Sequence, residues 1–121
     1  MKDAETTVQQ LKQRMAGFVA EREWGKYHRP KNLAMSLAVE AAELMEHFQW
    51  LDHAEADALL REAGNRREVG DEMADILAFL LSLANATGID LSEAFEAKML
   101  RNESKYPAEE VRGHYRRPRR A

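Results

Sequence analysis

Two pairs of acidic residues stand at helical spacing in the middle of this 121-residue sequence, Glu40 with Glu43 and Glu72 with Asp75. Residues three apart are neighbours on one face of a helix. The stretch around the first pair, VEAAELMEHFQW (residues 39–50), is rich in apolar side chains. Burying an ionised carboxylate without a partner is expensive. The pattern therefore indicates that these acids have a partner, and a bound cation would supply one.

Carboxylates held this close together favour a hard divalent cation. Like charges repel and raise one another's pKa unless a positive charge lies between them. Mg²⁺ prefers oxygen ligands, and proteins commonly bind it through a few carboxylates together with the phosphates of a substrate. If the two helices pack antiparallel, the four acids converge. We therefore predict a Mg²⁺ site formed by Glu40, Glu43, Glu72 and Asp75, with hydrolysis of a phosphate ester or anhydride by a metal-activated water.

The same acids have two other interpretations. Most E-x-x-E pairs on helices are solvated surface charge, although two such pairs beside apolar faces weigh against that. A di-iron bundle would carry Glu-x-x-His pairs, but His47 follows Glu43 by four residues and no histidine follows a glutamate by three. The sequence also lacks cysteine, a Walker-type loop and a G-x-S-x-G motif. Nothing in it favours covalent catalysis.

The acids need helices to position them, and helical periodicity dominates the chain. Asn32, just after Pro30, is expected to cap the helix that carries the first pair. Gly88 is expected to end the helix that carries the second, and Asp90 or Ser92 to cap the next one. We expect long helices over residues 5–23, 33–50, 66–87 and 92–104, with a short one within 54–63.

A helical wheel at about 100° per residue separates the glutamates of the second helix. Glu40 falls on the edge of its apolar face, Glu43 at the border of that face and Glu46 on the solvent side. Residues 76–84 (ILAFLLSLA) are apolar almost all round, which predicts burial on several sides, partly by a second subunit. We expect an all-α, four-to-five-helix bundle that assembles as a homo-oligomer.

Composition narrows the class of protein further. Hydrophobic residues make up 45% and charged residues 32% of the chain, as in globular proteins. The polar N-terminus and the short apolar runs predict neither a signal peptide nor a membrane span, and we expect a cytoplasmic protein. The net charge is −3, but residues 112–121 carry five arginines and no acid. We expect a helical catalytic domain over residues 1–110, a basic, disordered tail over 111–121, and no dedicated nucleic-acid binding.

Four blocks occur in a recognisable order. EREWGKYHRPKNL (residues 21–33) precedes the E-x-x-E pair, FQW (residues 48–50) follows it, and 28 residues separate the E-x-x-E from the E-x-x-D pair. KMLRNESKYP (residues 98–107) comes last. In these blocks, from about residue 15 to about residue 110, the sequence resembles the all-α MazG-like nucleoside triphosphate pyrophosphohydrolases, and within them the dCTP pyrophosphatase branch.

The resemblance implies a fold and a reaction. Members of this family form compact helical bundles that assemble as dimers or dimers of dimers. They cleave between the α- and β-phosphates and release a nucleoside monophosphate and pyrophosphate. By the same resemblance, the catalytic Mg²⁺ ligands are Glu40, Glu43, Glu72 and Asp75.

The resemblance also implies a set of substrate-binding residues. Trp24, His28 and Trp50 would line the nucleobase pocket. Phe79 stands at the substrate site where relatives often carry tyrosine, which leaves fine substrate preference open. The phosphates would be met from one helix face, with a tyrosine near the sugar or the phosphates: Lys98, Asn102 and Tyr106.

We therefore predict a Mg²⁺-dependent hydrolase that converts dCTP, or a modified dCTP, to its monophosphate and pyrophosphate and so clears unwanted nucleotides. Two alternatives remain. One is the same chemistry on dUTP or a purine triphosphate. The other is a non-enzymatic helical module that binds a partner through its apolar helices and an acidic surface through its basic tail.

Overall fold

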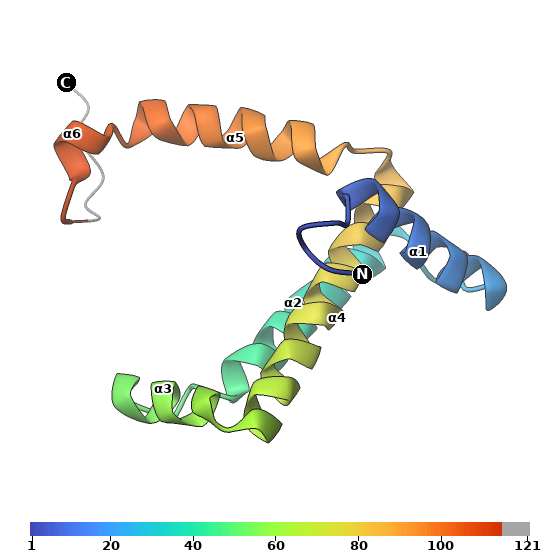
Figure 1. Ribbon diagram of the computed structural model, residues 1–121. Helices are drawn as coiled ribbons and strands as arrows, with labels where there is room; N and C mark the ends of the chain where they lie inside the picture. The colour runs from blue at the N-terminus through green and yellow to red at the C-terminus, as the bar shows by residue number, and fades with distance from the viewer. Residues whose placement is uncertain (115–121) are drawn as a thin grey trace. The chain divides into compact units, whose positions relative to one another are not determined.

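The computed structural model describes residues 1–114, and this part of the chain is helical with no strand (Figure 1). The chain forms two compact units, Met1–Gly88 and Ile89–Ala121. The expectation of an all-α fold is confirmed. The described residues form α1 (Val8–Glu21), α2 (Pro30–Glu46), α3 (His53–Arg61), α4 (Ala63–Thr87), α5 (Leu91–Lys105) and α6 (Ala108–Val111).

Reciprocal caps decide where α1 and α3 begin. The backbone N–H of Gln10 donates to Thr7 Oγ1 at 3.1 Å, and the N–H of Thr7 donates back to Gln10 Oε1 at 2.8 Å. Asp52 and Glu55 make the same pair of bonds at the start of α3. Each pair satisfies two backbone groups that a helix start leaves free. For this reason α1 begins at Val8, three residues later than the sequence predicts.

The start of α2 corrects one prediction. The helix begins at Pro30, whose fixed φ and missing N–H suit the first helical position. Asn32 therefore lies inside the helix and does not cap it; its side-chain amide donates to the carbonyl of Tyr27 at 3.2 Å. The helix also ends at Glu46, four residues before its predicted end, so residues 47–50 form a turn.

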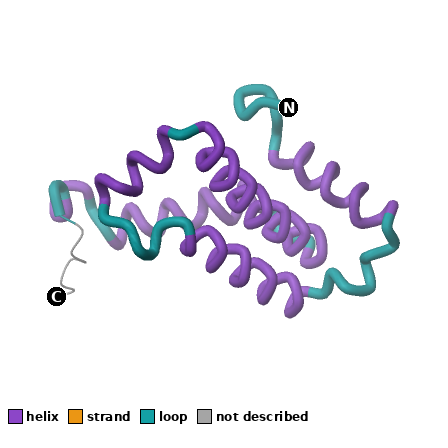
Figure 2. Tube along the Cα trace, turned by 90° about the horizontal axis from the view of Figure 1, so that it is seen from below, coloured by secondary structure: helices purple, strands orange, loops and turns teal. Residues whose placement is uncertain are grey.

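Helix α4 is the centre of the first unit. It packs against α2, α1 and α3, with α2 running antiparallel beside it (Figure 1). The two longest connections of this unit, residues 22–29 and 47–52, flank α2 (Figure 2). The amide of Asn85 in α4 donates to the carbonyl of Lys12 in α1 at 3.0 Å, which ties α1 to the C-terminal half of α4.

The core of the first unit is small. Leu33, Val69, Leu81 and Ala84 are its buried apolar residues. The predicted burial of residues 76–84 holds only in part: Leu81, Ser82 and Ala84 are buried, most of the other positions are half-buried, and the side chain of Leu77 is 41% exposed. Other large apolar side chains on α2 and α4 are exposed as well: Met35, Val39, Met45 and Met73.

The second unit begins with the predicted cap. The carboxylate of Asp90 accepts a hydrogen bond from the N–H of Glu93 at 2.9 Å, and α5 ends at Lys105, before Pro107. The short helix α6 was not predicted, and it contains the first residue of the predicted tail, Val111. Most of that tail, residues 115–121, lies outside the described residues.

No single helix in the described part of the chain is both long and apolar enough to cross a membrane.

Gly88 ends α4 as predicted, and its conformation is one that other residues avoid. Its φ is 71°, and its N–H donates to the carbonyl of Ala84 at 2.9 Å. An L-residue in this left-handed region costs about 1–2 kcal/mol. We therefore expect Gly88→Ala to lower the free energy of unfolding by about 1 kcal/mol in chemical denaturation. The matched control is Gly17→Ala on the exposed face of α1, where an added Cβ meets nothing within 4 Å. That change is expected to raise the same quantity by about 0.5–1 kcal/mol, and a gain from both substitutions would contradict the prediction.

Candidate active site

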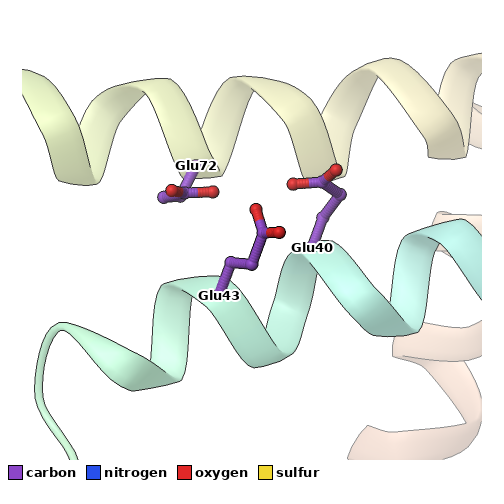
Figure 3. Close-up of side chains that lie close together, drawn as sticks. All are labelled: Glu40, Glu43 and Glu72. Carbon is purple, nitrogen blue, oxygen red and sulfur yellow. The ribbon is translucent and has the colours of Figure 1, made fainter.

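Three of the four predicted acids converge between α2 and α4. One oxygen of each of Glu40, Glu43 and Glu72 lies within 4.8 Å of one oxygen of each of the other two. Figure 3 shows the carboxylate of Glu43 between those of Glu40 and Glu72. The antiparallel packing brings them together, because α2 contributes two neighbouring turns and α4 faces them. We call these three residues the carboxylate cluster.

The cluster is electrostatically costly without a cation. Burial, contact with Glu43 and repulsion from Asp75 and Glu72 raise the pKa of Glu40 to about 7. Burial and the charge of Glu43 also raise the pKa of Glu72, while the nearby His47 acts in the opposite direction. A positive charge among the three oxygens would reverse these shifts, because it stabilises the ionised forms.

Two oxygens of the cluster fit a metal by their environment as well. Glu40 Oε2 and Glu72 Oε2 are buried and have no hydrogen-bond partner. Buried polar atoms are nearly always paired, and the exceptions call for an explanation. A half-buried, all-oxygen donor set with two unpaired oxygens suits a hard divalent ion such as Mg²⁺. The acidic cluster is thus a candidate metal centre.

Asp75 takes a different place from the other three acids. It is exposed and lies outside the carboxylate cluster, yet it is near enough to raise the pKa of Glu40. Its side chain lines a neighbouring cavity. Direct coordination of a metal by Asp75 stays a prediction.

The neighbouring cavity lies between α1, the loop after it and α4. Its volume is about 510 Å³, and its lining is mostly apolar. Trp24, His28, Asp75 and Phe79 are among the lining residues. His28 Nδ1 is buried without a hydrogen-bond partner. A mostly apolar cavity with a few polar groups is typical of sites that bind small organic ligands. We call it the aromatic pocket.

Local backbone geometry positions Trp24 in this pocket. Helix α1 ends in a Schellman motif: the N–H of Trp24 donates to the carbonyl of Val19, and the N–H of Glu23 donates to that of Ala20. Glu23 occupies the left-handed position, with φ of 53°, where glycine is usual. The ring of Phe18 then packs edge-on against Trp24, with centroids 5.8 Å apart. The indole is thereby held beside the C-terminal end of α1.

Trp50 does not line the aromatic pocket. It stands in the turn after α2 and is 86% exposed. The sequence predicts that α2 continues through this turn, whereas the helix ends at Glu46. The expected role of Trp50 at a nucleobase stays a prediction.

The predicted phosphate-binding residues belong to the second unit. Lys98 and Asn102 lie one turn apart on α5, and Tyr106 directly follows that helix. The N–H of Tyr106 donates to the carbonyl of Asn102 at 2.7 Å, and Lys105 Nζ lies over the Tyr106 ring. Their roles toward a substrate stay predictions.

Two features were missed at the sequence level. Leu11, Met15 and Phe18 of α1 line the aromatic pocket, and their helical spacing in the sequence indicates only one apolar face. His47 lies 3.7 Å from Glu72, and its position one turn after Glu43 was the available signal.

The raised pKa of Glu40 predicts how stability depends on pH in the absence of metal. The folded chain keeps the Glu40 proton up to about pH 7, whereas the unfolded chain loses it near 4.5. The folded state therefore binds more protons in this interval, and stability falls as pH rises through it. We expect the melting temperature in EDTA to fall more steeply between about pH 5 and about pH 8 for the wild type than for Glu40→Gln. The exposed Glu46 provides the control, because Glu46→Gln should follow the wild type. If the melting temperatures of the wild type and Glu40→Gln change with pH in parallel, the raised pKa of Glu40 is wrong.

Comparison with known proteins places this arrangement in a family. The model of the MazG-like family matches residues 35–116. The chain is 36% identical over 109 residues to dCTP pyrophosphatase 1 of Rattus norvegicus, covering 90% of this chain and 64% of that protein. It is 34% identical over 113 residues to dCTP pyrophosphatase 1 of Homo sapiens, covering 93% of this chain and 66% of that protein. It thus spans just under two thirds of the length of these relatives. A crystal structure of a pyrophosphatase from Archaeoglobus fulgidus superimposes with a TM-score of 0.75 at 39% identity, covering 88% of this chain and 98% of that one. The chain therefore belongs to the MazG-like family and has its all-α fold.

Proposed function

We propose that this protein is a Mg²⁺-dependent nucleoside triphosphate pyrophosphohydrolase that hydrolyses dCTP, or a modified dCTP, to the monophosphate and pyrophosphate. The observation that carries the proposal is the carboxylate cluster beside the aromatic pocket. Such a pair of neighbours suits a ligand with an apolar, stackable base at one end and a metal-bound polyphosphate at the other. The similarity to dCTP pyrophosphatase 1 supports the choice of base.

Glu40, Glu43 and Glu72 would hold the cation, with Asp75 at the edge of the cluster. A bound Mg²⁺ would neutralise phosphate charge and lower the pKa of a coordinated water. The chain contributes a rigid arrangement of oxygens, because the three side chains come from the packed faces of two long helices. Two of those oxygens, Glu40 Oε2 and Glu72 Oε2, have no hydrogen-bond partner, as expected of oxygens that would meet a cation.

The aromatic pocket would hold the nucleoside. The Trp24 ring, 42% exposed, offers a face on which a base can stack. His28 Nδ1 offers a buried polar atom to the edge of the base, and Phe79 offers an apolar wall without a hydroxyl. We also propose that Lys98, Asn102 and Tyr106 of the second unit contact the phosphates or the sugar, since a lysine supplies compact charge to a phosphate.

We further propose a homodimer or homotetramer. Several large apolar side chains of α2 and α4 are exposed, among them Met35 at 60%, Val39 at 57% and Met73 at 58%, and Trp50 is 86% exposed. Apolar surface gathered on two packed helices commonly marks an interaction site. A second copy of the chain would cover such a surface.

Catalysis is tested by release of pyrophosphate from a panel of nucleoside triphosphates with Mg²⁺. We expect turnover with a preference for a deoxycytidine nucleotide. Glu40→Ala should lower kcat by at least about 100-fold, because it removes a ligand of the cation. The control is Glu46→Ala, on the solvent side of the same helix, which should leave kcat unchanged. Circular dichroism checks that both variants fold.

The same assay distinguishes the alternatives. A preference for dUTP or a purine triphosphate would preserve the chemistry and change the assignment of the base. If no triphosphate is hydrolysed, the enzymatic proposal is wrong and the helical interaction module becomes the better description.

Assembly is tested by light scattering after gel filtration at micromolar concentration. We expect the mass of two or four chains for the wild type. Val39→Glu should shift the mass toward one chain, because it places a charge in the apolar surface. Gln13→Glu adds the same charge at an exposed polar position of α1 and should not change the mass. A wild-type protein that elutes as a single chain would exclude the proposed oligomer.

A further inference from the structure

His47, the residue that follows the last residue of α2, lies beside the carboxylate cluster. Its Nε2 lies 3.7 Å from Glu72 Oε1, and the two side chains are each 22% exposed. His47 follows Glu40 and Glu43 at spacings of seven and four, which places all three on one stripe of the helix. Its backbone is still helical, with φ −64° and ψ −23°, so the stripe continues to His47 although α2 ends at Glu46.

The two oxygens of Glu72 have different surroundings. Oε1 faces His47, whereas Oε2 is buried without a hydrogen-bond partner. At 3.7 Å the contact with His47 is longer than an ordinary hydrogen bond. Contacts of this kind are often long in ligand-free sites and shorten when the ligand binds. One oxygen of Glu72 thus lies next to the imidazole of His47, and the other has no hydrogen-bond partner.

We propose that His47 is a positioning residue that orients the Glu72 carboxylate so that Oε2 faces the bound cation. This inference rests on the metal centre of the proposed function and adds to it a residue outside the four predicted ligands. Carboxylates that bind metals are themselves held by hydrogen bonds from neighbouring groups, and loss of such a group typically costs 10–100-fold in metal affinity. His47 occupies that place for Glu72, and it comes from the same helix as Glu40 and Glu43.

The test measures Mn²⁺ binding by electron paramagnetic resonance, with Mg²⁺ as competitor and no nucleotide present. We expect His47→Leu to weaken binding of both ions by about 10–100-fold. His47→Gln keeps a side-chain N–H donor and should restore most of the affinity, which a purely structural role would not explain. The matched control is His53→Leu, because His53 is an exposed histidine in α3 and should bind like the wild type. If His47→Leu does not fold, His47→Asn replaces it, since its shorter amide cannot reach Glu72, and it should bind as weakly.

The outcomes separate this inference from the proposed function. If Glu40→Gln weakens Mn²⁺ binding and the folded His47 variants do not, the role of His47 is wrong and the metal centre stands. If Glu40→Gln also binds like the wild type, the metal centre itself is wrong and the inference falls with it. Loss of Co²⁺ binding in His47→Leu with Mg²⁺ binding unchanged would make His47 a direct nitrogen ligand and would overturn the positioning role. Because binding is measured without turnover, the result does not depend on which nucleotide is the substrate.

Discussion

Repulsion among three half-buried carboxylates is the constraint on which this structure depends. Glu40, Glu43 and Glu72 face one another across the α2–α4 contact (Figure 3). Folding of the metal-free chain must either protonate part of this cluster or bear the cost of burying and crowding its charges; burial first, and then the contact and repulsion with neighbouring acids, raise the pKa of Glu40 to about 7. A fold selected only for stability would place apolar side chains there. The electrostatic cost has a reason if the cluster binds a cation. Carboxylates that lie close together repel one another without a cation, and together they stabilise a cation that is bound.

Helix α4 and the end of α1 connect the α2–α4 contact to the aromatic pocket. Helix α4 carries Glu72 and Asp75 on neighbouring turns, so one helix joins the carboxylate cluster to the aromatic pocket. On the other side of the pocket, the Schellman motif at the end of α1 sets the direction of Trp24. Glu23 accepts a left-handed conformation to make that turn. The strained backbone of Glu23 therefore helps to position the ring of Trp24.

The first unit combines a small core with several exposed large apolar side chains. Leu33, Val69, Leu81 and Ala84 are its buried apolar residues, whereas Val39 and Met73 of the packed helices remain exposed. Burial contributes about 25 cal/mol per Å² of apolar surface, so covering this surface with a second copy would add materially to stability. The helices that carry the carboxylates would then be held from both sides, which would link the proposed assembly to the rigidity of the candidate metal centre.

Much of the fold follows from the sequence because helix signals are local. Gly88 and Asp90 act where they were expected, since a left-handed stop and a side-chain cap involve only residues within one turn. Helical periodicity is also a local signal, and it separated Glu40 and Glu43 from the surface residue Glu46. Asn32 was misjudged because Pro30 offered an earlier helix start, and α2 was extended too far because residues 47–50 carry no glycine or proline to mark its end.

The features that only the tertiary structure decided are contacts between helices. Periodicity could not tell that Glu72 joins the cluster while Asp75 faces the aromatic pocket, because that depends on the crossing of α4 with α2. Nor could it tell that Leu11, Met15 and Phe18 line a cavity rather than fill a core, or that His47 meets Glu72. The sequence by itself determined which residue types stand at which helical positions. Their distances across the bundle are set by side-chain packing over residues far apart in the chain, and no local pattern encodes those distances.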